Sequence, residues 1–280
     1  MKVITAALNN PILIEVQYYT LKKYMKCNYE FIVFNDAKYW PEFTNYGTED
    51  MMDKIEETCK KLKIKCIELP NKKKQKSYSQ ADQRTADYMT FITKYILANP
   101  DKYLYIEPDM FLLDDFKLED YENYYCATTI LNTTNKKISY PNHGIFYIDS
   151  SNSEIKSNKN ILDWKVDAKY NTNYPGDYDK LNEVGEKCST WLLSLDTNKV
   201  KYMTKLSGNW SKINIPERLL KLETLLSTDP RNKNGLYFAE LYDDKFLYFK
   251  CSGNFNKIAA DQQQKLTMLL INNINILLAS

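Results

Sequence analysis

Glycine is scarce in this sequence, which contains only 7 glycines among 280 residues. Dinucleotide-binding folds use a G-x-G-x-x-G turn and P-loop proteins use G-x-x-x-x-G-K-[ST], because glycine lets the backbone approach a phosphate closely. Neither pattern occurs in the chain. The sequence therefore excludes a glycine-rich phosphate cradle of either kind.

Histidine and paired cysteines are lacking as well. His143 is the only histidine, and no two of the six cysteines have the C-x-x-C spacing of a zinc site. A hydrolytic triad would depend on His143 alone, and no nucleophile elbow surrounds it. Because no secretory signal is recognised, the dispersed cysteines predict free thiols in a reducing compartment, and we expect a cytoplasmic protein.

Neither an excess of one charge nor a long apolar run is present. The 38 basic and 36 acidic residues leave a formal net charge of +2, which provides no global field for nucleic acid or for an anionic membrane. No apolar run has the length of a bilayer span. Hydrophobic residues make up 44% of the chain, enough for a substantial core, and no linker or repeat interrupts it. We expect a single domain, 1–280.

Two carboxylates interrupt an otherwise apolar stretch. The run Tyr103–Ile106 predicts a buried strand, and a second apolar run, Met110–Leu113, follows shortly after it. Between them stand Glu107 and Asp109, on either side of Pro108, which should break ladder pairing because it lacks an N–H. Two carboxylates at a strand end suit a divalent cation with oxygen ligands, and ordinary solvated acids are the alternative.

The chain before these acids alternates between strand and helix. The predicted elements are 2–8, 12–25, 30–34, 48–62, 64–69 and 79–98. Three βα units predict a parallel sheet with right-handed crossovers. Open α/β sheets bind ligands at the carboxyl ends of their strands, where Asn9, Asp36 and Glu107 fall. This convergence favours a functional role for the acids.

The chain after the acids follows a different pattern. Its predicted strands are 125–130, 145–149, 236–241 and 246–250, its predicted helices are 182–195, 219–226 and 257–278, and Pro141–Gly144 is a predicted turn. The last helix is strongly apolar; we interpret it as core, with a homodimer or a membrane-surface contact as the alternative. Together the pattern predicts an α/β domain with a nucleotide-binding half, 1–116, and an acceptor-side half, 117–280.

Several motifs in order resemble glycosyltransferases of the GT-A fold. Tyr103–Leu112 (YLYIEPDMFL) is similar to the strand that leads into that family's Asp-x-Asp motif, and Ser79–Met89 to the helix before it. Asn142–Asp149 is similar to the family's Asn-Ser-Gly and the strand after it, and Phe246–Asn254 to its late strand and Gly-containing loop. The resemblance implies a Rossmann-type open mixed sheet flanked by helices. The Lys- and Asn-rich composition also resembles glycosyltransferases of large DNA viruses, which would place the protein in the host cytoplasm or the virion.

The resemblance also implies a donor, an acceptor and a metal. The donor would be a nucleotide sugar, with UDP as the expected nucleotide, and the acceptor a glycan or a protein. Asp109 and Glu107 would hold Mn²⁺ or Mg²⁺ on the donor diphosphate. The other implied donor contacts are Thr5, Ala6, Asn9, Asp36, Arg84, Asp87, Asn142, His143, Gly144, Lys250 and Gly253. Pairing of Arg84 with an acid on its own helix, and a His143 bonded to backbone in a turn, are the structural alternatives.

The chain departs from the family pattern at two positions. The first acid is Glu107 where the family has Asp, and Lys250 stands where the family has its late His. A charged lysine cannot bind a metal, but it can neutralise a diphosphate directly. We therefore expect Asp109 to be the firmer metal ligand, and the metal to be weakly held or partly replaced by Lys250.

A carboxylate base is the remaining catalytic requirement of an inverting glycosyltransferase, because the acceptor hydroxyl must lose a proton. The candidates are Asp177, Asp179 and Glu183, and Glu183 is preferred because it falls in the first turn of the predicted helix 182–195. Helix-capping or surface acids are the alternative. A retaining enzyme would need no such base, and the sequence leaves both mechanisms open.

Two other functions fit parts of the pattern. A sugar nucleotidyltransferase resembles the same fold but carries a Gly-rich loop after its first strand, and residues 6–10 (AALNN) contain no glycine. A non-catalytic virion or scaffold protein that retained the fold would explain Glu107, Lys250 and the absent late histidine.

Overall fold

The computed structural model describes part of the chain. The described residues are 1–8, 11–37, 50–70, 81–132, 139–157, 162–165, 168–170, 178–180, 184–207, 237–251 and 278. They cluster into two compact units, which take their residues from alternating parts of the sequence. The first unit contains 1–4, 68–106 and 118–203, and the second contains 5–67, 107–117 and 204–280.

The first unit is built on five neighbouring strands. In sheet order they are β10 (Val200–Tyr202), β6 (Cys126–Asn132), β7 (Ser139–Asp149), β4 (Lys102–Ile106) and β1 (Lys2–Ala7). β1 is parallel to β4 and β10 is parallel to β6, whereas β7 is antiparallel to both β4 and β6. The sheet is therefore mixed, and β1 continues beyond residue 4 into the second unit.

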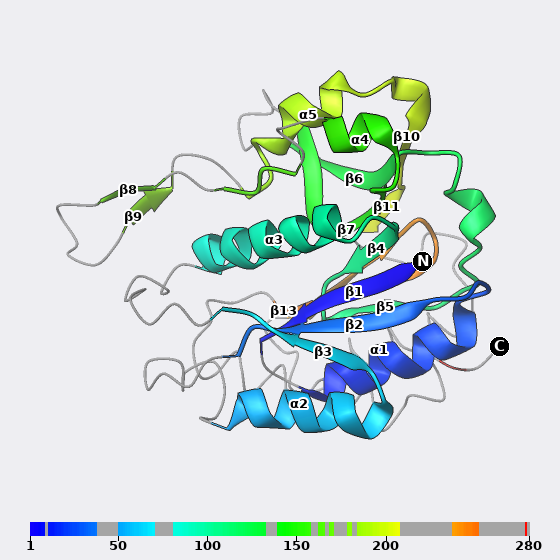
Figure 1. The fold of residues 1–280 in the computed structure, drawn as a ribbon, viewed down its shortest axis with the longest axis vertical. Coiled ribbons are helices and arrows are strands. Elements are labelled where there is room, and N and C mark those ends of the chain that lie inside the picture. The colour runs from blue at the N-terminus through cyan, green and yellow to red at the C-terminus, as the bar shows by residue number, and fades with distance from the viewer. Residues whose placement is uncertain are drawn as a thin grey trace. The chain divides into compact units, whose positions relative to one another are not determined.

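Helices and aromatic side chains cover this part of the sheet. The helices are α3 (Ala81–Ala98), α4 (Ser153–Ser157) and α5 (Cys188–Ser194), and α3 runs alongside β4 and β7 in Figure 1. The rings of Tyr105 and Phe146 stack at 5.2 Å, and Phe146 lies 5.7 Å from Trp164. The buried indole of Trp164 donates to Thr93 Oγ1 on α3 at 3.1 Å, so its polar group is satisfied within the core. A short antiparallel pair, β8 (Ala168–Tyr170) and β9 (Tyr178–Lys180), completes the unit.

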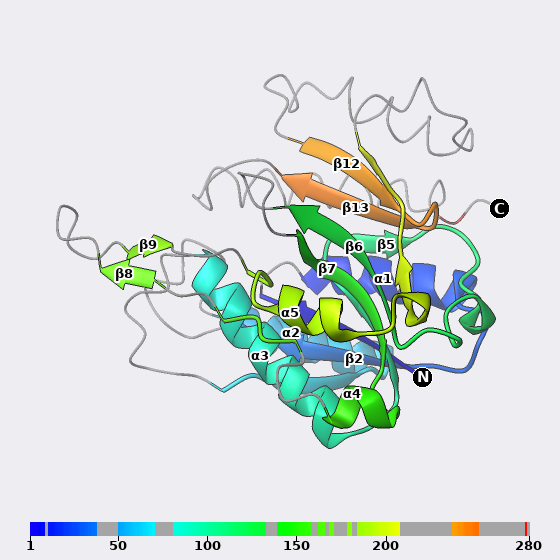
Figure 2. The same cartoon turned by 90° about the horizontal axis from the view of Figure 1, so that it is seen from above.

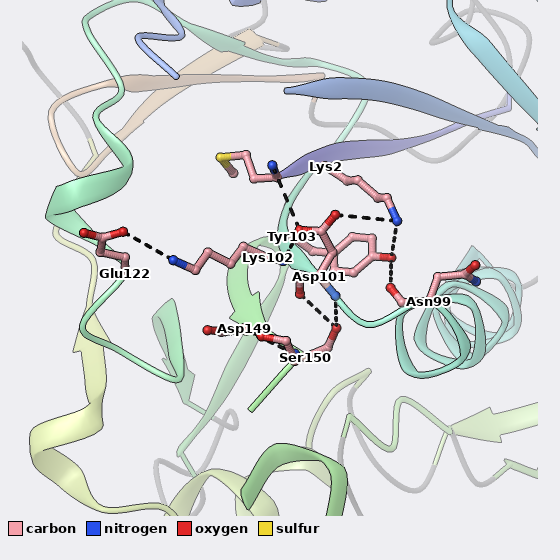
Figure 3. Close-up of polar contacts among 10 residues, drawn as sticks. Lys2, Asn99, Asp101, Lys102, Tyr103, Glu122, Asp149 and Ser150 are labelled. Carbon is pink, nitrogen blue, oxygen red and sulfur yellow. Dashed lines mark hydrogen bonds and ion pairs between the residues drawn. The ribbon is translucent and has the colours of Figure 1, made fainter. Parts of the chain in front are cut away.

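A polar network fixes the start of β4. The buried Ser150 donates through its hydroxyl and its backbone N–H to Asp101 O, at 2.9 and 3.0 Å (Figure 3). Lys2 Nζ lies 3.7 Å from the Asp101 carboxylate and donates to the Tyr103 hydroxyl at 3.3 Å. The Tyr103 hydroxyl in turn bonds to Asn99 O at the end of α3. The entry of the strand is thus held firmly, and the two acids follow its other end.

The second unit contains β2 (Glu30–Asn35) and β3 (Lys65–Glu68), the two strands that follow β1 in the order of the seven-stranded sheet, and a separate four-stranded sheet. β2 lies beside β1, and β3 lies beside β2. The smaller sheet is antiparallel, in the order β11 (Lys205–Ser207), β12 (Tyr237–Tyr242), β13 (Phe246–Cys251) and β5 (Met110–Leu112). Figure 2 shows β12 and β13 side by side. The positive φ angles of Asp243 and Asp244 form the tight turn that joins them.

Two helices pack in the second unit. They are α1 (Pro11–Tyr24) and α2 (Met51–Leu62). Helix α1 contacts both α2 and β5. Helix α2 ends where Lys63 adopts φ 57°, and the following N–H of Ile64 bonds back to Cys59 O at 2.8 Å. This is the left-handed termination that satisfies the last carbonyls of a helix. In the described part of the chain, no helix has both the length and the apolar character to cross a membrane.

The predicted α/β fold, with a mixed sheet flanked by helices, is confirmed. The single domain and its division at residue 116 stay predictions.

The predicted turn at Pro141–Gly144 is wrong, because these residues lie within β7. The pairing of β7 with β6 changes from Thr128 opposite Phe146 to Ile130 opposite Pro141, so the strand is irregular there. Asn142 Oδ1 accepts a hydrogen bond from Gly144 N at 2.8 Å. The turn-forming residues therefore make a local Asn turn inside a bulged strand, and the chain does not reverse.

The predicted helix 182–195 is too long. Helix α5 begins at Cys188, after turn residues that include Gly185 with φ +89°, a value outside the helical region. The preference for Glu183 therefore loses its basis, because residue 183 does not fall in the first turn of this helix. Glu183 itself, the predicted helix 219–226 and the predicted helix 257–278 up to residue 277 lie outside the described residues.

Candidate functional site

Glu107 and Asp109 lie on a tight turn between β4 and β5, here called the acid turn (Glu107–Met110). Met110 N donates to Glu107 O at 3.0 Å, which closes a four-residue β-turn with Pro108 at its second position. Proline favours that position because its φ is already fixed near the required value. Both acids are partly exposed, whereas Met110 is buried. The predicted break between the two strands at Pro108 is confirmed.

Gln17 holds the acid turn from helix α1. The side chain is wholly buried, and its Nε2 donates to Glu107 O at 2.7 Å and to Met110 O at 3.0 Å. One amide thus bonds to the first and the last residue of the turn. Reasoning from the sequence missed Gln17; the available signal was a glutamine four residues after Leu13 and four before Leu21, on the buried side of the helix.

Tyr248 approaches the acid turn from β13. It lies opposite Met110 in the β13–β5 pair, and its side chain hydrogen-bonds with that of Glu107. Burial, and then the negative charges of Glu107 and Asp109, hold the pKa of the Tyr248 hydroxyl well above its ordinary value. The hydroxyl therefore remains a donor. No signal marked this tyrosine among the 23 in the sequence.

A second polar cluster continues across the small sheet. The Tyr242 ring lies 6.1 Å from that of Tyr248, and its hydroxyl donates to Glu240 at 2.5 Å. Lys205 Nζ lies 2.8 Å from the other oxygen of the buried Glu240 carboxylate. This pair neutralises Glu240 within the sheet.

The predicted donor contacts on β1 and after β2 also belong to the second unit. Thr5 and Ala6 are buried in β1, and Thr5 Oγ1 finds no hydrogen-bond partner in the part of the chain that is described. Asp36 is buried, and its N–H donates to Ala7 O at 2.7 Å. The ends of β1 and β2 therefore lie side by side, as predicted from the alternating pattern. Asn9 lies outside the described residues.

Five of the other predicted donor contacts belong to the first unit. Asn142 and Gly144 are buried in β7, where they bond to each other, and His143 between them is half-buried. Asp87 is partly exposed on α3, and Arg84 lies on the same helix, where only its backbone is described. No contact with a ligand is tested for these residues, so their roles stay predictions.

The remaining predicted residues are described in backbone only or not at all. Lys250 lies opposite Phe238 on β12, two positions beyond Tyr248, and Asp179 lies opposite Lys169 in the β8–β9 pair. Asp177, Glu183 and Gly253 lie outside the described residues. Across the described ranges, no group of three or more His, Cys, Asp and Glu residues could hold a metal ion. A metal ion at the acid turn would be coordinated there by two protein carboxylates, those of Glu107 and Asp109.

Comparisons with protein-family models and with curated proteins give no match. Among solved structures, this chain is similar to an active-site mutant of LgtC, with 14% identity and a TM-score of 0.35 over 57% of this chain and 60% of that one. It is also similar to the galactosyltransferase LgtC in complex with donor and acceptor sugar analogues, with 14% identity and a TM-score of 0.38 over 82% of this chain and 81% of that one. The chain therefore spans less than two thirds of the length of the first of these structures.

Proposed function

We propose that this chain is a glycosyltransferase that transfers a sugar from a nucleoside diphosphate sugar, with UDP as the expected nucleotide, to a glycan or protein acceptor. The observation that carries the proposal is the acid turn, which presents two partly exposed carboxylates directly after β4. β4 is parallel to β1, and ligands of open α/β sheets bind at the carboxyl ends of such strands. The motif resemblance and the geometry of the turn support the same reading.

The two carboxylates fit a divalent cation. Mg²⁺ and Mn²⁺ prefer oxygen ligands, and a site with one or two protein carboxylates leaves the other positions to water and phosphate oxygens. Asp109 and Glu107 would hold the ion, which when bound would offset the charge that accumulates on the diphosphate. Lys250, two positions beyond Tyr248 on β13, is proposed as a further cation for the diphosphate.

The chain's own residues would prepare the site in advance. Gln17 holds both ends of the acid turn, and the Tyr248 hydroxyl directs the Glu107 carboxylate by a hydrogen bond. Preorganised groups stabilise a developing charge more strongly than mobile ones, because they need no reorganisation during the reaction. The acceptor base stays a prediction among Asp177, Asp179 and Glu183. The viral type, the cytoplasmic or virion location and the homodimer also stay predictions from the sequence.

A turnover screen tests the proposal. The full chain is incubated with a panel of nucleotide sugars and candidate acceptors in Mn²⁺, and release of nucleoside diphosphate is measured alongside the melting temperature. We expect one donor to be turned over and to raise the melting temperature by mass action. Full turnover in EDTA would refute the metal, and lack of any thermal response to every donor would favour a scaffold. Pyrophosphate release from a nucleoside triphosphate and a sugar phosphate would instead indicate a nucleotidyltransferase.

A further inference from the structure

We infer that Gln17 is a positioning residue that sets the direction of the two carboxylates of the acid turn. The inference rests on the proposed function for the ligand, a metal–diphosphate group, but its structural part concerns the turn alone. Gln17 belongs to helix α1, and 90 residues separate it from Glu107 in the sequence. None of the motif residues predicts a contact between them.

The hydrogen bonds of Gln17 restrain the turn at both ends. Its Nε2 donates to the carbonyl of Glu107 at 2.7 Å and to that of Met110 at 3.0 Å, and the same Glu107 carbonyl accepts Met110 N at 3.0 Å. The first and the fourth residue of the β-turn are therefore bound to one rigid group. Pro108 fixes φ at the second position. Asp109, at the third position, is left with little backbone freedom, so its carboxylate leaves the turn in a defined direction.

The burial of the Gln17 amide has a cost that the hydrogen bonds of its Nε2 must offset. Its side chain is wholly buried, and Oε1 has no hydrogen-bond partner among the described residues. A buried polar atom without a partner destabilises a fold, and an apolar side chain of similar size would avoid this cost. Most other buried positions of the helix, such as Leu13, Val16 and Leu21, carry apolar side chains. The presence of an amide at position 17 is therefore explained by the two hydrogen bonds that its Nε2 donates to the acid turn.

Gln17 would affect ligand binding indirectly, through the carboxylates of Glu107 and Asp109 that it positions. Partners that orient metal ligands typically change metal affinity by about 10- to 100-fold when they are substituted. We expect the same of Gln17, because loss of both hydrogen bonds lets the carboxylates of Glu107 and Asp109 rotate apart.

The test compares Gln17→Met with the wild type and with Leu21→Met, all as the full chain. Methionine approximates the volume of glutamine but donates no hydrogen bond, and Leu21→Met is a volume-conserving change at a buried position on the same helix. Binding of UDP in MnCl₂ is measured by calorimetry, and hydrogen exchange of the Asp109 and Met110 amides is followed in parallel. We expect UDP affinity to fall at least about tenfold in Gln17→Met and to stay near wild type in Leu21→Met. Exchange at both amides should quicken only in Gln17→Met.

The following outcomes test whether Gln17 positions the carboxylates of the acid turn. Faster exchange without loss of UDP affinity would overturn the positioning role, and so would an equal loss in Leu21→Met. If the wild type binds no UDP and no nucleotide sugar, the proposed function fails, and the exchange data alone then decide whether Gln17 holds the turn. If Gln17→Met does not fold, Gln17→Asn keeps the polarity but shortens the reach, and it is expected to show the same two changes; wild-type behaviour in that variant would overturn the inference.

Discussion

The Tyr248 hydroxyl hydrogen-bonds with the side chain of Glu107, across the pairing of β13 with β5. Burial and the two nearby carboxylates raise the pKa of Tyr248, so the phenol stays protonated and Glu107 stays the acceptor at neutral pH. The acid turn is therefore restrained from two sides, by Gln17 at its backbone and by Tyr248 at a carboxylate.

Removal of this hydroxyl should weaken donor binding without unfolding the protein. We expect Tyr248→Phe to cost about 0.5–1.5 kcal/mol of UDP binding in Mn²⁺, or roughly two- to twelvefold in affinity. Calorimetry measures the effect. Tyr242→Phe is the matched control, because it removes a hydroxyl that bonds to Glu240 on its own strand, β12. Equal losses in the two variants would show that the hydrogen bond to Glu107 has no special role.

A side chain at Gly185 should destabilise the fold. Gly185 has φ +89°, and a Cβ there would lie 2.9 Å from Trp164 Cζ3 and 3.1 Å from Pro141 O. We expect Gly185→Ala to lower the free energy of unfolding by about 2–4 kcal/mol, through backbone strain and overlap with the buried indole. Urea unfolding measures the change. Trp164→Phe in the same chain should relieve part of the overlap, so additive effects of the two substitutions would contradict this explanation.

The buried thiol of Cys126 should make stability fall in alkali. Burial raises the pKa of Cys126 from 9.0 to about 12. The pKa of the thiol is higher in the folded protein than in the unfolded chain. The stability that the buried, protonated thiol contributes is therefore complete below pH 9 and is lost as the pH rises from 9 to 12. We expect the stability advantage of the wild type over Cys126→Ala to shrink by about 2 kcal/mol between pH 8 and pH 10.5.

Urea unfolding of both proteins across that range measures the difference. Between pH 6.5 and pH 8 the same difference should stay constant. A constant difference up to pH 10.5 would mean that the thiol ionises as easily in the folded protein as in the unfolded chain.

The acid turn could be predicted because its signal is local. An apolar run, a proline that cannot pair and a second apolar run lie within about ten residues, and the strands at Lys102–Ile106 and Met110–Leu112 follow from them. The alternation of strands and helices before the turn is local in the same sense.

The partners of the turn could not be predicted, because they depend on pairing between distant segments. Gln17 and Tyr248 reach Glu107 only through the packing of α1 and the register of β13 with β5. Where local signals failed, a competing constraint decided the structure. Gly185 at positive φ precedes the start of α5, and Pro141–Gly144 belong to β7, in which Pro141 pairs with Ile130 of β6.

Titration of UDP in Mn²⁺ into Asp109→Asn and the wild type tests directly whether Asp109 is needed to bind a metal–diphosphate group. Asparagine preserves the size of the side chain but removes the charge, and Asp114→Asn controls for the loss of an exposed carboxylate two residues after the end of β5. We expect the wild type and Asp114→Asn to bind UDP, and the affinity to fall at least about tenfold in Asp109→Asn with an unchanged melting temperature. Binding of UDP by Asp109→Asn with wild-type affinity would contradict this expectation.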